Sequence, residues 1–151
     1  MAENLKAKKW EAYCKENNIT AFVREDLFDG SGTVLFRSAV QVDDYTVPFA
    51  VIVEDSIFTV IRVQMAGNLI SDENRAAVHE YINLMNRSYK IFKYVAVEDG
   101  TVFLDSCIPA VADFFDAELV RAILDIIVSH VTDEYKNLLR AGGLLPKMRA
   151  N

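Results

Sequence analysis

The chain has 151 residues, a length typical of one domain, and 52% of them are hydrophobic, which is too apolar for a disordered protein. Its net charge of −6, from 22 acidic and 16 basic side chains, disfavours nucleic acid as a partner because an acidic surface repels phosphate. Cys14 and Cys107 have no CxxC spacing, and no apolar run reaches the roughly 20 residues of a membrane span.

These bulk properties fit a single soluble domain over residues 1–151 in a reducing, cytoplasmic compartment. The polar N-terminus lacks the apolar stretch of a signal peptide. We therefore expect neither a membrane nor a nucleic acid as a partner.

The first predicted element is a helix over residues 3–17, whose narrow apolar face follows a three- and four-residue spacing: Ala7, Trp10 and Cys14. The same helix carries the only dense basic patch of the sequence, at Lys6, Lys8 and Lys9. Acidic residues flank these lysines, which favours a solvated helix face. Docking of this helix on an anionic membrane or on a partner is the alternative, although its apolar face is short.

Three strands are predicted next, over residues 34–42, 45–53 and 57–65, because apolar residues alternate there with a period of two. Short polar turns separate them, as in an antiparallel meander. Pro48 cannot donate a ladder hydrogen bond, so its strand should be an edge at that point or carry a bulge. The segment 19–28 before these strands is ambiguous and compatible with one short extended piece.

A second helix is predicted from Ser71, whose hydroxyl can cap the first turn, to Tyr89. Two further strands, 91–97 and 101–108, flank Asp99-Gly100, a dipeptide typical of hairpins.

Asp116 is a plausible cap for the last helix, which is expected to run to about residue 140. Gly142 then provides the stop, and residues 143–151 are expected to form a loose tail.

The predicted fold is therefore α+β, with an antiparallel sheet and the order α-β-β-β-α-β-β-α. In an acidic chain of this length, that order resembles the YbjN-like family and the related class I type III secretion chaperones. The resemblance covers roughly residues 33–140, and three stretches carry it: Val34–Val63, Ala76–Lys93, and Val102–Asp105 leading into the last helix. It implies a small protein, often dimeric and without a catalytic centre, that acts as a chaperone or a regulator of other proteins.

A search for catalytic and metal-binding patterns finds no site. His79 precedes Glu80 but has no histidine four residues on, so the HExxH arrangement of zinc sites is missing. His130 lies on the apolar stripe of the last helix and is interpreted as a satisfied core or interface histidine. The two cysteines have no basic neighbour in sequence and are expected to be buried structural thiols, although a spatial Cys–His pair stays open.

Paired acidic residues and one glycine-rich loop also have structural interpretations. Asp43-Asp44, Glu54-Asp55 and Glu98-Asp99 all fall in predicted turns, where Asp is favoured for backbone reasons. Gly30-Ser31-Gly32 lacks the remaining residues of a dinucleotide or P-loop motif. We predict no catalytic residues, no cofactor and no metal.

Two strands are apolar on both faces: Ala50 and Ile52 alternate with Phe49 and Val51, and Phe92 and Tyr94 with Val95 and Val97. Such strands are either covered by helices on both sides or available to a partner. The sequence thus favours a non-enzymatic protein-binding module that acts as a homodimer. The alternative is a small enzyme or ligand-binding domain with a pocket between the sheet and the last helix, for which the candidate polar groups are Arg37, Arg62, Asp105 and His130.

Overall fold

The computed structural model describes residues 3–147, and within that range the chain forms an α+β fold with a six-stranded antiparallel sheet and three α-helices. The helices are α1, α2 and α3, with a 3-10 turn η1 ahead of α3: Leu5–Glu16, Arg75–Ser88, Ala117–Ala141 and Ala112–Phe114. The strands β1 to β6 are Val23–Asp26, Val34–Val42, Tyr45–Val53, Phe58–Ala66, Lys93–Ala96 and Val102–Pro109. The predicted fold class is confirmed.

The strand predictions hold closely where apolar residues alternate. β2 and β3 coincide with the predicted ranges, and the segment that the sequence left ambiguous contains the short strand β1. β5 is shorter than the predicted 91–97, and the side-chain amide of Asn86 in α2 binds its backbone. Asn86 Oδ1 accepts from Tyr94 N at 2.6 Å, and its Nδ2 donates to Tyr94 O at 3.1 Å.

The strands are ordered β1-β2-β3-β4-β6-β5, so that β6 lies between β4 and β5. Pro48 pairs with Ala39 of β2 but lies outside the register of β3 with β4, which begins at Phe49. The strand is therefore locally an edge at Pro48, as the missing N–H predicted. A register shift between Gln64 and Ala66 follows on β4, where it pairs with β6.

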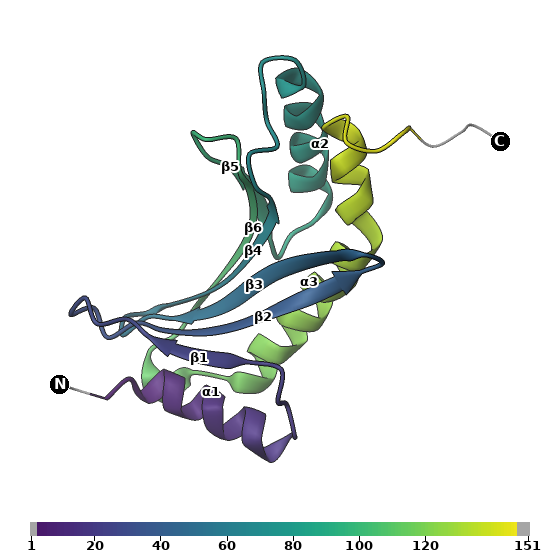
Figure 1. Ribbon diagram of the computed structural model, residues 1–151. Helices are drawn as coiled ribbons and strands as arrows, with labels where there is room; N and C mark the ends of the chain where they lie inside the picture. Colours follow the sequence, from purple (N-terminus) through teal and green to yellow (C-terminus); the bar gives the residue numbers. More distant parts are fainter. Residues whose placement is uncertain (1–2, 148–151) are drawn as a thin grey trace.

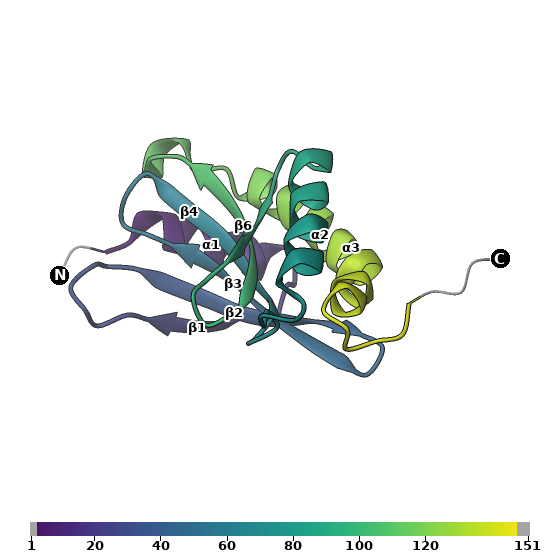
Figure 2. The same cartoon turned by 90° about the horizontal axis from the view of Figure 1, so that it is seen from above.

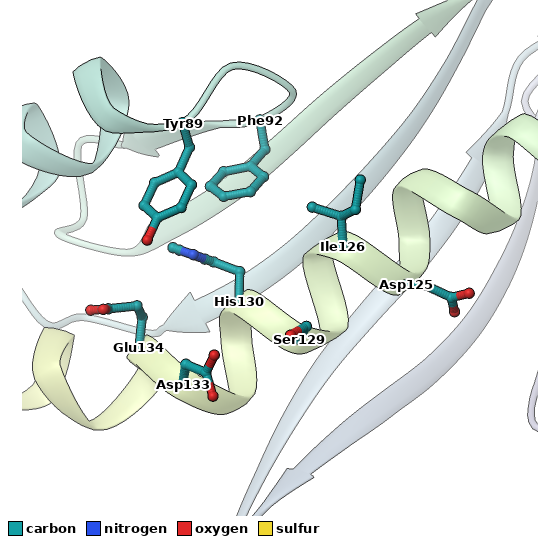
Figure 3. A pocket seen from close by; sticks show the side chains of 8 residues that line it. All are labelled: Tyr89, Phe92, Asp125, Ile126, Ser129, His130, Asp133 and Glu134. Carbon is teal, nitrogen blue, oxygen red and sulfur yellow. The ribbon is translucent and has the colours of Figure 1, made fainter.

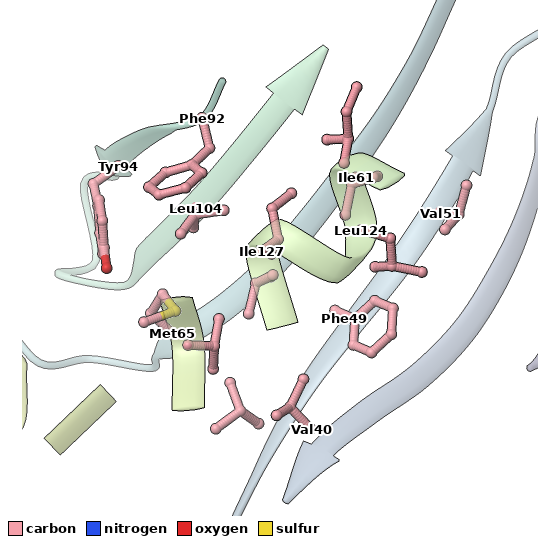
Figure 4. Close-up of a cluster of buried hydrophobic side chains, with 14 of the residues drawn as sticks. Val40, Phe49, Val51, Ile61, Met65, Phe92, Tyr94, Leu104, Leu124 and Ile127 are labelled. Carbon is pink, nitrogen blue, oxygen red and sulfur yellow. The ribbon is translucent and has the colours of Figure 1, made fainter. Parts of the chain in front are cut away.

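The helices of the described chain gather on one face of the sheet, as Figures 1 and 2 show. The core lies between this covered face and the helices, and its side chains interlock as in Figure 4. Val51, Ile61 and Leu104 point into it from three neighbouring strands and are all 0% exposed. Ile127 of α3, also 0% exposed, meets them from the helix layer.

The N-terminal helix is fastened to the sheet by Asn4, which is 8% exposed. Its Oδ1 accepts from Ala7 N at 2.9 Å and caps α1, while its Nδ2 donates to Gly32 O and Val53 O, both at 2.9 Å. One side chain thus satisfies backbone groups of a helix end, a loop and a strand end.

Lys6 departs from the expectation of a solvated basic helix face. It is 2% exposed, and its Nζ donates to Phe58 O at 2.9 Å and to Thr59 Oγ1 at 3.2 Å. Burial lowers the pKa of this amine. The expectation fails because α1 packs across the end of β4, a contact between segments more than 50 residues apart.

The predicted cap Ser71 is also wrong, since α2 begins at Arg75 with Asn74 as the preceding residue. Asn74 Oδ1 accepts from Ser71 N at 2.7 Å, and its Nδ2 donates to Leu69 O at 2.8 Å and to Gly142 O at 3.0 Å. These bonds join the start of α2 to the end of α3 and hold residues 71–74 outside the helix.

The last helix begins and ends as predicted. Asp116 Oδ1 accepts from Leu119 N at 3.1 Å, and Gly142 is the C-terminal cap residue. Residues 148–151 of the predicted tail lie outside the described range. Within that range Leu144 N donates to Leu139 O at 2.9 Å, and Leu145 packs against the core.

Candidate functional site

The face of the sheet opposite the helices is covered by no element of residues 3–147, and we call it the open face. It is defined by the residues that alternate with the buried ones on the central strands: Leu35, Arg37, Ala50, Ile52, Val60, Arg62, Phe103 and Asp105. The sequence left open whether helices cover both faces or one. In the structure, the helices of residues 3–147 cover only one face of the sheet.

The strand register aligns four residues of the open face in a single row across the sheet, which Val23 of β1 and Lys93 of β5 extend at its two ends. Arg37 pairs with Val23 and Ala50, Arg62 pairs with Ala50 and Asp105, and Asp105 pairs with Lys93. We call this the charged row: Val23, Arg37, Ala50, Arg62, Asp105 and Lys93. Because each pair is a direct cross-strand neighbour, the side chains stand side by side on the same face.

The next row along the strands is apolar at its centre. Leu35 pairs with Ile52, Ile52 with Val60, and Val60 with Cys107. Leu35 is 9% exposed, while Ile52 and Val60 are half-buried. The open face thus combines an apolar row with a charged row, as binding surfaces often do.

A hollow of about 410 Å³ lies over the middle of the charged row. The small side chain of Ala50 forms its floor, because Ala50 is flanked in register by the longer Arg37 and Arg62. Ile52 and Phe103 add apolar surface to its lining, and Gln64 adds a polar amide. Its volume falls at the lower end of the range for binding sites in proteins.

The two arginines of the hollow are held by carboxylates on neighbouring strands. Arg62 forms a bidentate pair with Asp105, with Nε and Nη2 each 2.8 Å from a carboxylate oxygen, and its guanidinium lies 4.9 Å from the centre of the Phe103 ring. The bond to Asp105 raises the pKa of Arg62. Arg37 donates through Nε to Glu25 on β1. Both guanidiniums are thereby oriented before any ligand arrives.

Several donors of these arginines face no acceptor within the described chain. Arg62 keeps Nη1 free, and Arg37 keeps both terminal nitrogens free. Lys93 contributes less, since its amine turns back to Asn86 O and Tyr89 O near the end of α2. The hollow can therefore receive an apolar group over Ala50 and hydrogen-bond acceptors on either side of it.

His130 lies on the opposite side of the sheet, in a second hollow of about 490 Å³ between α3 and the segment before β5 (Figure 3). The ring packs against Tyr89 and Phe92, and its Nε2 shares a 2.7 Å hydrogen bond with the Tyr94 hydroxyl. Burial lowers the pKa of His130, and Glu134 and Asp133 partly oppose this shift. His130 is thus buried and hydrogen-bonded, which agrees with its interpretation as a satisfied core or interface histidine.

The structure separates the four polar candidates of the alternative hypothesis. Arg37, Arg62 and Asp105 meet on the open face, whereas His130 belongs to α3 on the other side of the sheet. They do not converge in a pocket between the sheet and the last helix. The sequence singled out Ala50 only as an apolar residue on the second face of its strand, because the register alone places this small residue between two arginines.

The cysteines and the remaining histidine form no reactive pair within residues 3–147. Cys14 is buried, and burial raises the pKa of its thiol. Cys107 is exposed on the open face, which corrects the expectation that both thiols are buried. Alternation turns Cys107 away from the core because its neighbours Ser106 and Ile108 point inward. His79 is exposed on α2.

The acidic pairs lie in the hairpin turns in which they were predicted. Asp43 adopts a positive φ of 51° between β2 and β3 and pairs with Lys136. Asp99 Oδ1 accepts from Thr101 N at 2.9 Å in the β5–β6 turn, and this bond lowers its pKa. In the part of the chain that the structure describes, no group of three His, Cys, Asp or Glu residues could hold a metal ion.

Comparison with known proteins adds no relative. No family model matches this chain, and no curated protein matches it. Among the helices of residues 3–147, none has both the length and the apolar character that crossing a membrane requires.

Proposed function

We propose that this chain is a non-enzymatic protein-binding module that docks another polypeptide on the open face. The observation that carries the proposal is the one-sided coverage of the sheet, with an apolar row and a preorganised pair of arginines left on the uncovered side. In a small domain, each face of an antiparallel sheet is normally either polar and exposed to solvent or covered by other elements.

The sheet edges support docking on the face and not strand addition. Asn86 occupies the outer edge of β5 through its bonds to Tyr94. At the other edge, β1 is short and its last three residues, Arg24, Glu25 and Asp26, are charged. Short, charged or covered edges discourage pairing with a further strand.

The role of such a module is chaperone-like or regulatory, in keeping with the resemblance to YbjN-like proteins and secretion chaperones. We also propose that two copies of the chain associate into a homodimer. Light scattering at micromolar concentration tests it: a mass of twice 17.0 kDa is expected, and a clean monomer would contradict the homodimer.

Docking on the open face is tested by capture of partners from host cells at native expression, with crosslinking and mass spectrometry. We expect a recurrent, near-stoichiometric protein partner for the wild-type chain and its loss for Ile52→Glu, which places a charge in the apolar row. The matched control is Leu84→Glu on α2, an apolar residue that is 42% exposed away from the open face. Recovery of the bait alone, or unchanged capture by Ile52→Glu, would refute the proposal.

A further inference from the structure

We propose that the partner of the open face is an acidic apolar segment, in which a leucine-like side chain is flanked on both sides by Asp or Glu. This inference rests on the proposed function and specifies the chemistry that the same site selects.

The first step is the spacing of the two arginines. Arg37 and Arg62 stand two strands apart in one row, with Ala50 between them. Neighbouring strands are about 4.8 Å apart, so the two Cα atoms lie roughly 10 Å from each other. In an extended segment, residues i and i+4 lie on the same face with their Cα atoms roughly 13 Å apart. The long side chains of arginine and glutamate can bridge the difference between this span and the distance between the two arginines.

The second step is the chemistry of what is exposed. The Arg37 side chain is 54% exposed and that of Arg62 46%, whereas Asp105 is 22% exposed. Glu25, the partner of Arg37, is itself 46% exposed, so Glu25 and Asp105 each orient one guanidinium, and only the remaining guanidinium nitrogens are free to donate outward. Carboxylates are the acceptors that bind a guanidinium most strongly, often through two bonds at once.

The third step is the apolar floor. Ala50 is 7% exposed, and Ile52 and Phe103 also line the hollow, so a branched apolar side chain fits between the two arginines. The pattern Glu-X-Leu-X-Glu in an extended conformation presents one apolar and two acidic side chains to this row.

The final step is selectivity. The chain has a net charge of −6, and Glu25 and Asp105 each balance one of the two arginines, so the acidic segment is selected by the free terminal nitrogens of the guanidiniums and not by an excess of positive charge. A second copy of the chain fits less well, because the carboxylates of its own open face, Glu25 and Asp105, are already paired with its own arginines.

The experiment measures the binding of three fluorescent 15-residue peptides by anisotropy. They share a central Leu and differ only at the two flanking positions, which are Glu, Gln or Lys. We expect the Glu peptide to bind at least tenfold more tightly than the Lys peptide, with the Gln peptide between them.

The arginines are tested by the double variant Arg37→Gln, Arg62→Gln, which should lose most of this preference. The matched control is Arg121→Gln, which breaks the exposed Arg121–Asp125 pair on α3 and should leave the preference unchanged. Urea unfolding of each variant verifies the fold. Equal binding of the three peptides, no binding of any, or a preference that survives the double substitution would overturn the inference.

The same experiments separate this inference from the proposed function. If all three peptides bind equally and Ile52→Glu abolishes their binding, the open face is a docking site without acidic selectivity. If light scattering shows a dimer that Ile52→Glu converts to a monomer, the occupant is a second copy and the acidic segment is refuted. If Ile52→Glu changes neither partner capture nor peptide binding, both proposals fail.

Discussion

The two faces of the sheet are built from the same strands and differ in almost every physical respect. Val51, Ile61 and Leu104 on the covered face are 0% exposed, whereas their sequence neighbours Ile52, Arg62 and Asp105 lie on the open face. Alternation along a strand thus separates residues that stabilise the fold from residues that are free to bind. Substitutions on the two faces should therefore have separable consequences.

The largest expected difference is between two apolar truncations. Leu104→Ala should lower the free energy of unfolding by about 2–5 kcal/mol, because it leaves a cavity in the core. Ile52→Ala removes half-buried carbons from an uncovered face and should cost about 1 kcal/mol. Urea unfolding followed by circular dichroism measures both. Similar losses would mean that the open face is packed as tightly as the covered one.

The next effect concerns a buried polar side chain on the helix side of the molecule. Asn4→Ala should cost about 2–3 kcal/mol, because it removes the cap of α1 and leaves Gly32 O and Val53 O without their partner. Asn17→Ala is the control, since exposed Asn17 makes one bond to Tyr13 O and should cost about 0.5 kcal/mol or less. A loss at Asn4 no larger than at Asn17 would show that α1 is held by apolar packing alone.

A pH dependence should trace to His130 under the covered face. Burial lowers its pKa from 6.5 in the folded state, so the unfolded chain takes up a proton first as the pH falls. The stability it contributes is complete above pH 6.5 and is lost as the pH falls toward the folded pKa. Between pH 7.5 and 5.5, the urea midpoint should fall less for His130→Gln than for the wild type, while exposed His79→Gln should follow the wild type. Parallel curves for all three proteins would contradict this assignment.

Substitution of Arg62 should have the smallest effect on the free energy of unfolding, although it should have the largest effect on binding. Arg62→Gln breaks the bidentate pair with Asp105, but the arginine side chain is 46% exposed, so the loss should be about 1 kcal/mol or less and shrink in high salt. Urea unfolding at 0.05 and 1 M salt measures it. A loss of several kcal/mol would make Arg62 a structural residue and remove the separation between the two faces.

Much of the fold could be predicted because it depends on local patterns. Period-two alternation predicted β2 and β3 to the residue, and Asp116 and Gly142 marked the ends of α3. The predictions were wrong where contacts with distant segments of the chain override the preference of the local sequence. Ser71 has the chemistry of a cap, but Asn74 binds Leu69 O and Gly142 O and so delays the start of α2.

The candidate site shows the same limit. The sequence offered Arg37, Arg62 and Asp105, together with His130, as candidate polar groups of a pocket between the sheet and the last helix, yet no spacing along the chain relates them. Their alignment follows from the register of strands that are far apart in sequence, including the insertion of β6 between β4 and β5. A shift of one residue in any of these pairings would turn one member of the row into the core.

The sequence by itself determined the three helices, the strands other than β1, the residues that alternate on those strands and the absence of recognisable catalytic motifs. Those properties depend on backbone preferences and on burial patterns within a few residues. Only the tertiary structure decided that the helices cover one face, that Lys6 is buried, and that two arginines flank Ala50 on the open face. These depend on long-range packing and strand register, which are set by the free energy of the whole assembled sheet and not by any segment alone.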